Sequence, residues 1–200
     1  MKTSDNLSNT QPVNDNITSG ENLSVWFDAI KQPIFYESLT NDIDTDILVI
    51  GGGISGLTTA YCLAKEGRKV VLVEDGCIGS GESGRTTAHL TCALDDRYFQ
   101  LEKIYDEPTA QLAANSHMKA IEWVANTVKL NNIDCHFKRV DGYLFLHPSD
   151  TKETLEKEYE ATKRVGLTTE MLNAIPGIEA EDGKWCIKFP NQAQFHILLY

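Results

Sequence analysis

Three glycines and one glutamate are spaced so that they could hold a dinucleotide. The glycines form the pattern Gly51-x-Gly53-x-x-Gly56, directly after the apolar run Ile47–Ile50. The first glycine permits a tight turn, the second lets a pyrophosphate approach the backbone, and the third allows a helix to pack closely on a sheet. Glu74 follows Gly56 by 18 positions, close to the roughly 20 of the dinucleotide fingerprint. Its carboxylate could accept hydrogen bonds from ribose hydroxyls, and it would repel a 2′-phosphate, which argues against NADP.

Two strands and a helix must position these residues. Ile47–Ile50 and a second apolar run, Val70–Val73, suit strands that are buried on both faces of a parallel sheet. Between them, residues 54–66 have a helical pattern, and Gly67 fits the C-terminal cap. The N–H groups of the first helical turn would point at the phosphates, where the helix dipole adds partial positive charge. For the glycines alone, a turn without a ligand remains the alternative; together with the strands, the helix and the glutamate, they favour a dinucleotide site.

The loop after Glu74 bears on which dinucleotide binds, because the fingerprint alone does not separate FAD from NAD. Residues 78–91 are rich in glycine and carry Arg85 and several hydroxyl groups, which are suitable donors to phosphate oxygens. A solvated surface loop is the alternative interpretation. A simple NAD-binding unit would usually pass from its second strand into another helix and strand after a short connection. The loop therefore favours FAD.

The segment from Ile47 to Thr91 resembles the FAD-dependent oxidoreductases of the D-amino-acid oxidase type, most closely in its glycine turn and in Gly-Arg-Thr-Thr-Ala at 84–88. The most similar branch is bacterial, and its longer members end in a Rieske iron–sulfur domain. Ser24–Asp28 and Gln194–His196 also resemble that branch, so the resemblance covers about residues 24–200. It implies an α/β fold: a Rossmann-like FAD-binding domain with a parallel sheet, and part of an α+β antiparallel substrate domain.

The same resemblance implies a set of residues that hold FAD through its adenosine and pyrophosphate and toward the flavin. They are Gly51, Gly53, Ile54, Ser55, Gly56, Glu74, Arg85, Thr86, Thr87 and Ala88. His89, Thr91 and His196 fall near the flavin in the resemblance, but we assign no catalytic residue and no metal site. The implied reaction transfers hydride from an amine or amino-acid-like substrate to flavin. The alternatives are an NAD-dependent dehydrogenase and a non-catalytic nucleotide-binding module.

Composition limits the partners. The net charge of −11 and the lack of a basic stripe argue against nucleic acid. No apolar run approaches the ~20 residues of a membrane span, and the N-terminus lacks the apolar core of a signal peptide. We therefore expect a cytoplasmic protein with a small-molecule substrate and an electron acceptor. Its five cysteines show no metal-binding spacing, which favours buried thiols over a redox pair.

The second half of the chain predicts five further elements. They are a helix over 108–130; a hairpin of strands 135–139 and 143–147 around Asp141-Gly142; a helix from the cap Asp150 to Val165 with the ion pairs Glu153–Lys157 and Glu160–Arg164; a short helix over 169–174; and a strand over 184–189. The Asp-Gly pair is a strong hairpin signal. Asp150 and Glu153 resemble a capping box.

These elements predict three parts of the chain. Residues 1–22 form a disordered lead-in, 23–98 the FAD- or dinucleotide-binding part, and 99–200 a helical segment with a partial substrate domain. The last six residues are an apolar run with no cap or polar tail. We therefore expect an incomplete fold, the N-terminal fragment of a longer protein, which alone would bind FAD weakly.

Overall fold

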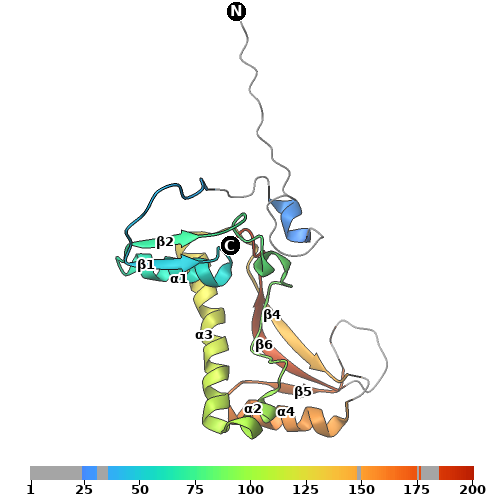
Figure 1. The fold of residues 1–200 in the computed structure, drawn as a ribbon. Coiled ribbons are helices and arrows are strands. Elements are labelled where there is room, and N and C mark those ends of the chain that lie inside the picture. Colours follow the sequence, from blue (N-terminus) through green and yellow to red (C-terminus); the bar gives the residue numbers. More distant parts are fainter. Residues whose placement is uncertain (1–23, 31–35, 148–149, 175, 177–184) are drawn as a thin grey trace, which may run out of the picture. The chain divides into compact units, whose positions relative to one another are not determined.

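The chain forms two compact units, drawn in Figure 1. The computed structural model describes residues 24–30, 36–147, 150–174, 176 and 185–200. The first unit extends to Thr87 and includes Ile197–Leu199, and the second comprises Ala88–His196 and Tyr200. The predicted lead-in over 1–22 lies outside the described residues. The expected mixture of a parallel sheet and an antiparallel sheet is confirmed.

The first unit contains the predicted strand–helix–strand motif. Strands β1 (Ile47–Ile50) and β2 (Val70–Val73) are parallel and in register from their first residues to their last. Helix α1 (Ile54–Lys65) connects them. Two short 3₁₀ turns, η2 (Val25–Ala29) and η3 (Glu82–Arg85), also belong to this unit. The local pattern of apolar runs and glycines therefore predicts this motif correctly.

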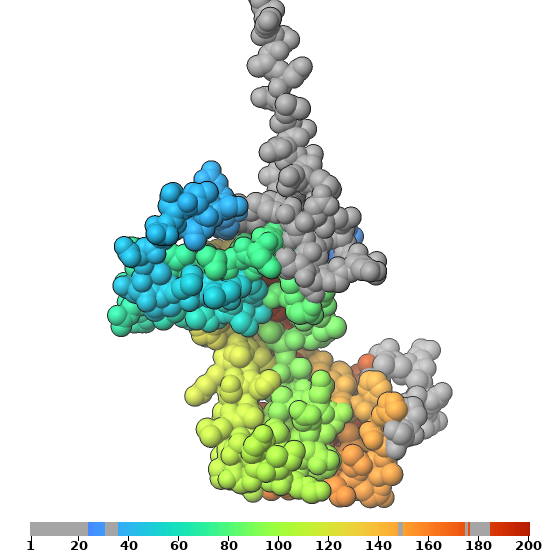
Figure 2. All heavy atoms as spheres, viewed as in Figure 1, coloured from blue at the N-terminus to red at the C-terminus, as the bar shows by residue number. Residues whose placement is uncertain are grey.

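One expectation for this motif is wrong: β1 is not buried on both faces. Leu48 is 54% exposed and Ile50 is 81% exposed, so alternate side chains of β1 face solvent. Helix α1 packs on the two strands, but a single helix covers only one face of a two-stranded sheet. Figure 2 shows the blue-to-cyan atoms of this unit at the surface of the molecule.

The described part of the second unit contains three helices: α2 (Tyr98–Ile104), α3 (Glu107–Asn131) and α4 (Lys152–Arg164). The expected helix over 108–130 is confirmed as α3. Its N-terminal cap is Asp106, whose carboxylate accepts the N–H of Thr109 at 2.8 Å. A core of buried residues joins the three helices: Tyr98, Ala110, Ala114, Ala161 and Val165.

The antiparallel sheet of this unit is organised around β6 (Cys186–Gln194). Strand β4 (Lys138–Phe145) pairs with β6 along one edge. Strands β3 (His89–Leu90) and β5 (Glu170–Leu172) pair with opposite ends of its other edge. The expected strand over 184–189 is confirmed as part of β6, whose residues Ile187 and Phe189 are buried in the core.

Two predicted elements of this region are wrong, both because pairing with β6 overrides a local signal. The expected hairpin around Asp141-Gly142 is instead the middle of the single strand β4, with a shift in register between Val140 and Gly142. The expected helix over 169–174 is instead β5, which pairs with β6. Tertiary pairing often overrides local propensity in this way.

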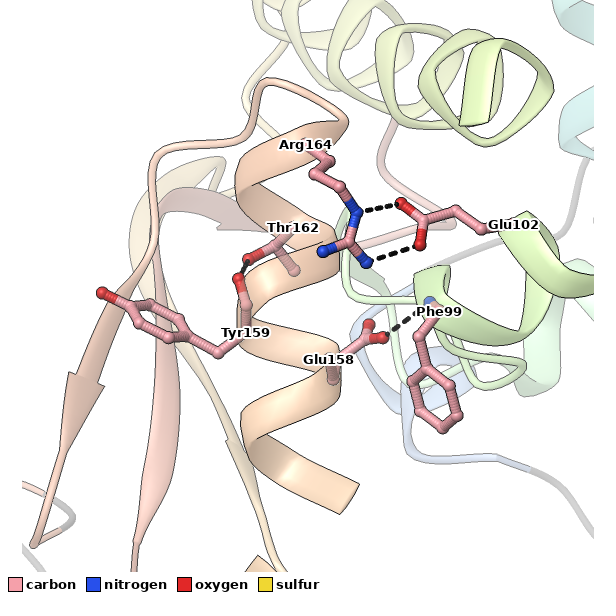
Figure 3. A network of polar contacts seen from close by, with 6 residues as sticks. All are labelled: Phe99, Glu102, Glu158, Tyr159, Thr162 and Arg164. Carbon is pink, nitrogen blue, oxygen red and sulfur yellow. Dashed lines mark hydrogen bonds and ion pairs between the residues drawn. The ribbon is translucent and has the colours of Figure 1, made fainter. Parts of the chain in front are cut away.

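The start and the ion pairs of α4 also differ from expectation. The cap is Thr151 and not Asp150. Glu160 pairs with Lys163 at 2.9 Å, and Lys152 pairs with Glu156 at 3.1 Å. Figure 3 shows why the partner of Arg164 differs from the expected Glu160. The Arg164 guanidinium turns to α2 and binds both carboxylate oxygens of Glu102, at 2.6 and 3.0 Å. Such a two-point contact with a carboxylate is stronger than a single contact along the helix.

Candidate functional site

The turn from β1 into α1 is built around two glycines. Gly51 has a φ of +104°, which glycine adopts without strain. Its N–H donates to the carbonyl oxygen of Val73 at 2.8 Å. A Cβ on Gly56 would lie 1.9 Å from the carbonyl oxygen of Gly51, so no side chain fits where α1 passes the turn. The glycine spacing therefore produces a close strand–turn–helix corner.

The first turn of α1 offers backbone N–H groups to an acceptor. Its cap is Gly53, which has no side chain to bind them. The N–H of Ile54 donates instead to the hydroxyl oxygen of Ser83, at 2.9 Å. Ser55 is exposed in the same turn. Because helix N-termini attract anions, the Ser83 oxygen marks a position that a phosphate oxygen could take.

Ser83 was not among the residues expected from the sequence. It comes from η3, 29 positions after Ile54, and the hydroxyl-rich composition of residues 78–91 was the only signal for it. That composition indicated a phosphate-binding loop without showing which hydroxyl group contacts α1.

Glu74 stands at the end of β2, and its carboxylate is bound by backbone donors. One oxygen accepts the N–H of Gly52, and the other accepts the N–H of Gly76 at 3.2 Å. Burial raises the pKa of Glu74, but hydrogen bonds from Gly52, Asp75 and Gly76 outweigh it and hold the pKa below its usual range. The carboxylate is therefore ionised at neutral pH and can act as a hydrogen-bond acceptor.

Arg85 ends η3 and holds a buried donor. Its Nε atom is inaccessible to solvent and has no hydrogen-bond partner among the described residues. Buried donors are normally paired, so this position suits an acceptor from a bound molecule. Thr86 and Thr87 follow and are exposed. The carbonyl oxygen of Thr86 accepts the indole N–H of Trp26 at 2.7 Å.

Ala88 is the one predicted cofactor residue that lies in the second unit; the other nine lie in the first. Ala88 is buried and has a φ of +55°, which is unusual for a residue with a side chain. Its carbonyl oxygen accepts the N–H of Phe195 at 3.3 Å. The structure thus brings Glu74 to the glycine corner and the η3 loop to α1, whereas Ala88 belongs to the antiparallel sheet region.

His89, Thr91 and His196 also lie in the second unit. His89 is exposed in β3, whereas His196 is buried beyond the end of β6. The His196 ring meets the His136 ring edge to face, with 6.3 Å between their centroids. Burial lowers the pKa of His196, and the neighbouring His136 lowers it further. From these contacts we assign no catalytic role to His89, Thr91 or His196.

Metal ligands, cysteines, hollows and apolar helices are the other features of the described residues that bear on function. They contain no group of three or more His, Cys, Asp or Glu side chains placed to hold a metal ion. Four of the five cysteines are buried free thiols, as expected, and Cys62 is an exposed one. An open hollow of about 460 Å³ lies between α2 and α4, but no predicted site residue lines it. Within the described ranges, no helix has the length and apolarity needed to cross a bilayer.

Curated relatives resemble most of this chain. A protein of Bacillus subtilis (strain 168), YhfW, named for a Rieske 2Fe-2S iron–sulfur cluster, is 31% identical over 175 residues, which are 88% of this chain and 34% of the relative. The gamma-glutamylputrescine oxidoreductase of Escherichia coli (strain K12) is 33% identical over 132 residues, which are 66% of this chain and 30% of the relative. The chain thus spans about a third of the length of these relatives.

Solved structures share the fold. The L-proline dehydrogenase of P. horikoshii matches with a TM-score of 0.61 at 20% identity, over 78% of this chain and 39% of that chain. The glycine oxidase of Bacillus cereus ATCC 14579 matches with a TM-score of 0.59 at 21% identity, over 78% of this chain and 42% of that chain. The likeness in fold agrees with the resemblance found in the sequence.

A family model described as "FAD dependent oxidoreductase", DAO, matches residues 46–200. The match begins just before β1 and includes the glycine corner, Glu74 and the η3 loop. The expected resemblance is confirmed, and the comparisons give no support to an NAD-dependent dehydrogenase. The chain belongs to the DAO family of FAD-dependent oxidoreductases.

Proposed function

We propose that this chain supplies the adenosine- and pyrophosphate-binding part of an oxidoreductase that uses FAD to oxidise an amine or amino acid. The observation that carries the proposal is the ionised carboxylate of Glu74 beside a glycine corner whose first helical N–H, that of Ile54, faces a hydroxyl oxygen. A carboxylate and a helix N-terminus in this order match the two ends of an adenosine diphosphate group.

The residues present fit FAD. Glu74 would accept hydrogen bonds from the ribose hydroxyls, and its charge disfavours a 2′-phosphate. The backbone at Gly51, Gly53, Ile54, Ser55 and Gly56 would line the pyrophosphate, because the glycines of the corner have no side chains of their own to keep it away. The buried Nε of Arg85 would donate to a phosphate oxygen, which gives that donor a partner. Thr86, Thr87 and Ala88 would continue this lining toward the flavin.

The substrate class follows from the relatives. One curated relative is named a gamma-glutamylputrescine oxidoreductase, and another, from Bacillus licheniformis, a glycine oxidase. Both names describe a substrate with a nitrogen next to an oxidisable carbon. When bound, FAD supplies the acceptor for a hydride from that carbon. The described residues of this chain would bind and orient the cofactor, and we assign none of them to the chemical step.

The net charge of the chain bears on its partners. The net charge of −11 supports a small-molecule substrate and argues against a nucleic-acid partner. An electron acceptor must reoxidise the cofactor. We propose a cytoplasmic location.

The test is a titration of the 200-residue chain with FAD, followed by the change in flavin fluorescence. We expect saturable binding, competition by ADP, and a dissociation constant that rises roughly tenfold or more in E74A and in R85A, because each loses a charge-assisted hydrogen bond. The variant E66Q, at the exposed end of α1, serves as the matched control and should bind as the unmodified chain does.

A second measurement tests the chemistry. The chain loaded with FAD is mixed with amines and amino acids without oxygen, and loss of the visible flavin absorbance reports reduction. Reduction by an amine or amino acid supports the proposed substrate class. A chain that binds neither FAD nor ADP would show that the proposal is wrong.

A further inference from the structure

The segment Ser24–Phe27, which we call the N-terminal clamp, is bound to the loop that carries Arg85. The hydroxyl group of Ser24 donates to the carbonyl oxygen of Gly84, 60 positions away. The indole N–H of Trp26 donates to the carbonyl oxygen of Thr86 at 2.7 Å. The clamp includes the first part of η2, the blue helical turn in Figure 1, and it belongs to the same unit as the loop.

The ring of Phe27 adds a third contact in the clamp. A Cβ on Gly84 would lie 3.0 and 3.1 Å from two carbon atoms of that ring, and 2.6 Å from the carbonyl oxygen of Gly79. The buried Gly84 is therefore enclosed between the ring and the loop backbone, and only glycine fits there. Three side chains of a four-residue segment thus fix the residues on both sides of Arg85.

The two bound carbonyl groups determine which way the loop backbone faces. In a trans peptide the C=O and the following N–H point in opposite directions. Since the carbonyls of Gly84 and Thr86 point at the clamp, the N–H groups of Arg85 and Thr87 are turned away from it. The clamp therefore holds two partially negative oxygens on its own side of the loop, and this fixes the backbone on both sides of Arg85.

We propose that Ser24 and Trp26 are positioning residues for the pyrophosphate of the cofactor, acting through the loop 84–87 and above all through Arg85. The inference rests on the proposed function, since it assumes that the anion held there is the pyrophosphate of FAD. It gives a role to a segment that the proposed function left without one. The clamp has no contact with the cofactor in this proposal; its effect on binding comes from preorganising the loop.

The first test measures FAD affinity in W26F, which keeps an aromatic ring but lacks the N–H donor, and in S24A. Losing one hydrogen bond should raise the dissociation constant roughly threefold to tenfold. V25A is the matched control, because Val25 lies in the same segment and is 70% exposed. It should bind as the unmodified chain does.

A double-mutant cycle separates positioning from general stability. If the clamp acts through Arg85, W26F should weaken FAD binding much less when R85A is already present. A loss of equal size in both backgrounds would mean that the clamp only supports the fold, and this would overturn the inference. Should W26F fold poorly, as judged by circular dichroism, S24A provides the same cycle with a smaller change in volume.

Hydrogen exchange of the ligand-free chain gives a readout that needs no cofactor. The amides of residues 84–87 should exchange faster in W26F and in S24A than in V25A, while those of α1 stay unchanged. If W26F and S24A alter neither loop exchange nor FAD affinity, the inference is wrong although the proposed function stands. If the unmodified chain binds neither FAD nor ADP, the proposed function is wrong, and the clamp's role in binding is wrong with it.

Discussion

The carboxylate of Glu74 accepts the backbone N–H of Gly52, 22 positions earlier in the chain. This bond joins the end of β2 to the turn after β1, at the level where the parallel register ends with Ile50 opposite Val73. One side chain thereby holds the corner together and presents an ionised acceptor beside it. The residue expected to recognise ribose is therefore also a structural part of the turn.

The bond predicts a pH-dependent contribution of Glu74 to stability. Because the pKa of Glu74 is lowered in the fold, its contribution is present above the unfolded pKa and is lost as the pH falls through the folded pKa. E74Q should lower the free energy of unfolding by about 1 to 2 kcal/mol at neutral pH. Urea unfolding at several pH values measures this, with E66Q as control. A difference that does not shrink in acid would contradict the prediction.

The tight contact at Gly56 predicts that any side chain there destabilises the fold. A Cβ there would lie 1.9 Å from a backbone oxygen of Gly51, which cannot move aside as a flexible side chain could. G56A should therefore destabilise the first unit by about 3 kcal/mol and push α1 away from β1. G81A is the control, because a Cβ on Gly81 meets nothing within 4 Å. Thermal unfolding of both variants measures the effect, and equal melting temperatures would refute it.

The glycine corner could be predicted because every signal for it is local. The apolar runs, the glycine spacing and Glu74 all fall within 28 consecutive residues, and the strand–helix–strand motif needs only their order. The start of α1 was less predictable. Its first N–H is bound by Ser83, 29 positions away, and no spacing rule identifies which hydroxyl of a flexible-looking loop returns to a helix.

The sequence alone mispredicts the hairpin because the partner of Asp141 is distant in the sequence. Its carboxylate accepts the N–H of Asn191, 50 positions later. Pro190 and Asn191 together stand opposite Asp141, between the pairs Val140–Gln192 and Gly142–Phe189. This bulge accommodates a proline, which has no N–H to donate, in the middle of a strand. Asp-Gly marks a bulge of the sheet here, and local composition alone does not distinguish a bulge from a turn.

The same bulge gives a third prediction, at Asn191. Its φ of +58° lies in the left-handed region, which Asn and Gly tolerate better than other residues. N191A should therefore lower the free energy of unfolding by about 1 kcal/mol, while N191G should change it little. Both variants lose the same side chain, so chemical unfolding of the pair isolates the backbone effect. Equal losses in the two would show that the side chain, and not the φ angle, matters.

The contribution of Glu158 to stability should depend on pH in the opposite direction to that of Glu74. It is 1% exposed on α4, and Figure 3 shows its carboxylate at the start of α2, where it accepts the N–H of Phe99 at 3.2 Å. Its other oxygen has no hydrogen-bond partner among the described residues. Burial raises the pKa of Glu158; backbone hydrogen bonds from Tyr98 and Phe99 and the charge of Arg97 oppose this, and Glu102 adds to it.

Because the folded chain holds this proton more tightly than the unfolded chain, stability from Glu158 is complete below the unfolded pKa and falls as the pH rises through the folded pKa. E158Q keeps an acceptor for Phe99 without a charge, so it should be at least as stable as the unmodified chain at neutral pH. E158A leaves that N–H unpaired and should be about 1 to 3 kcal/mol less stable than E158Q at every pH. Urea unfolding from acid to neutral pH measures all three proteins. If the stability of the unmodified chain relative to E158Q increased with pH, Glu158 would be a stabilising anion, and the assignment of a raised pKa would be wrong.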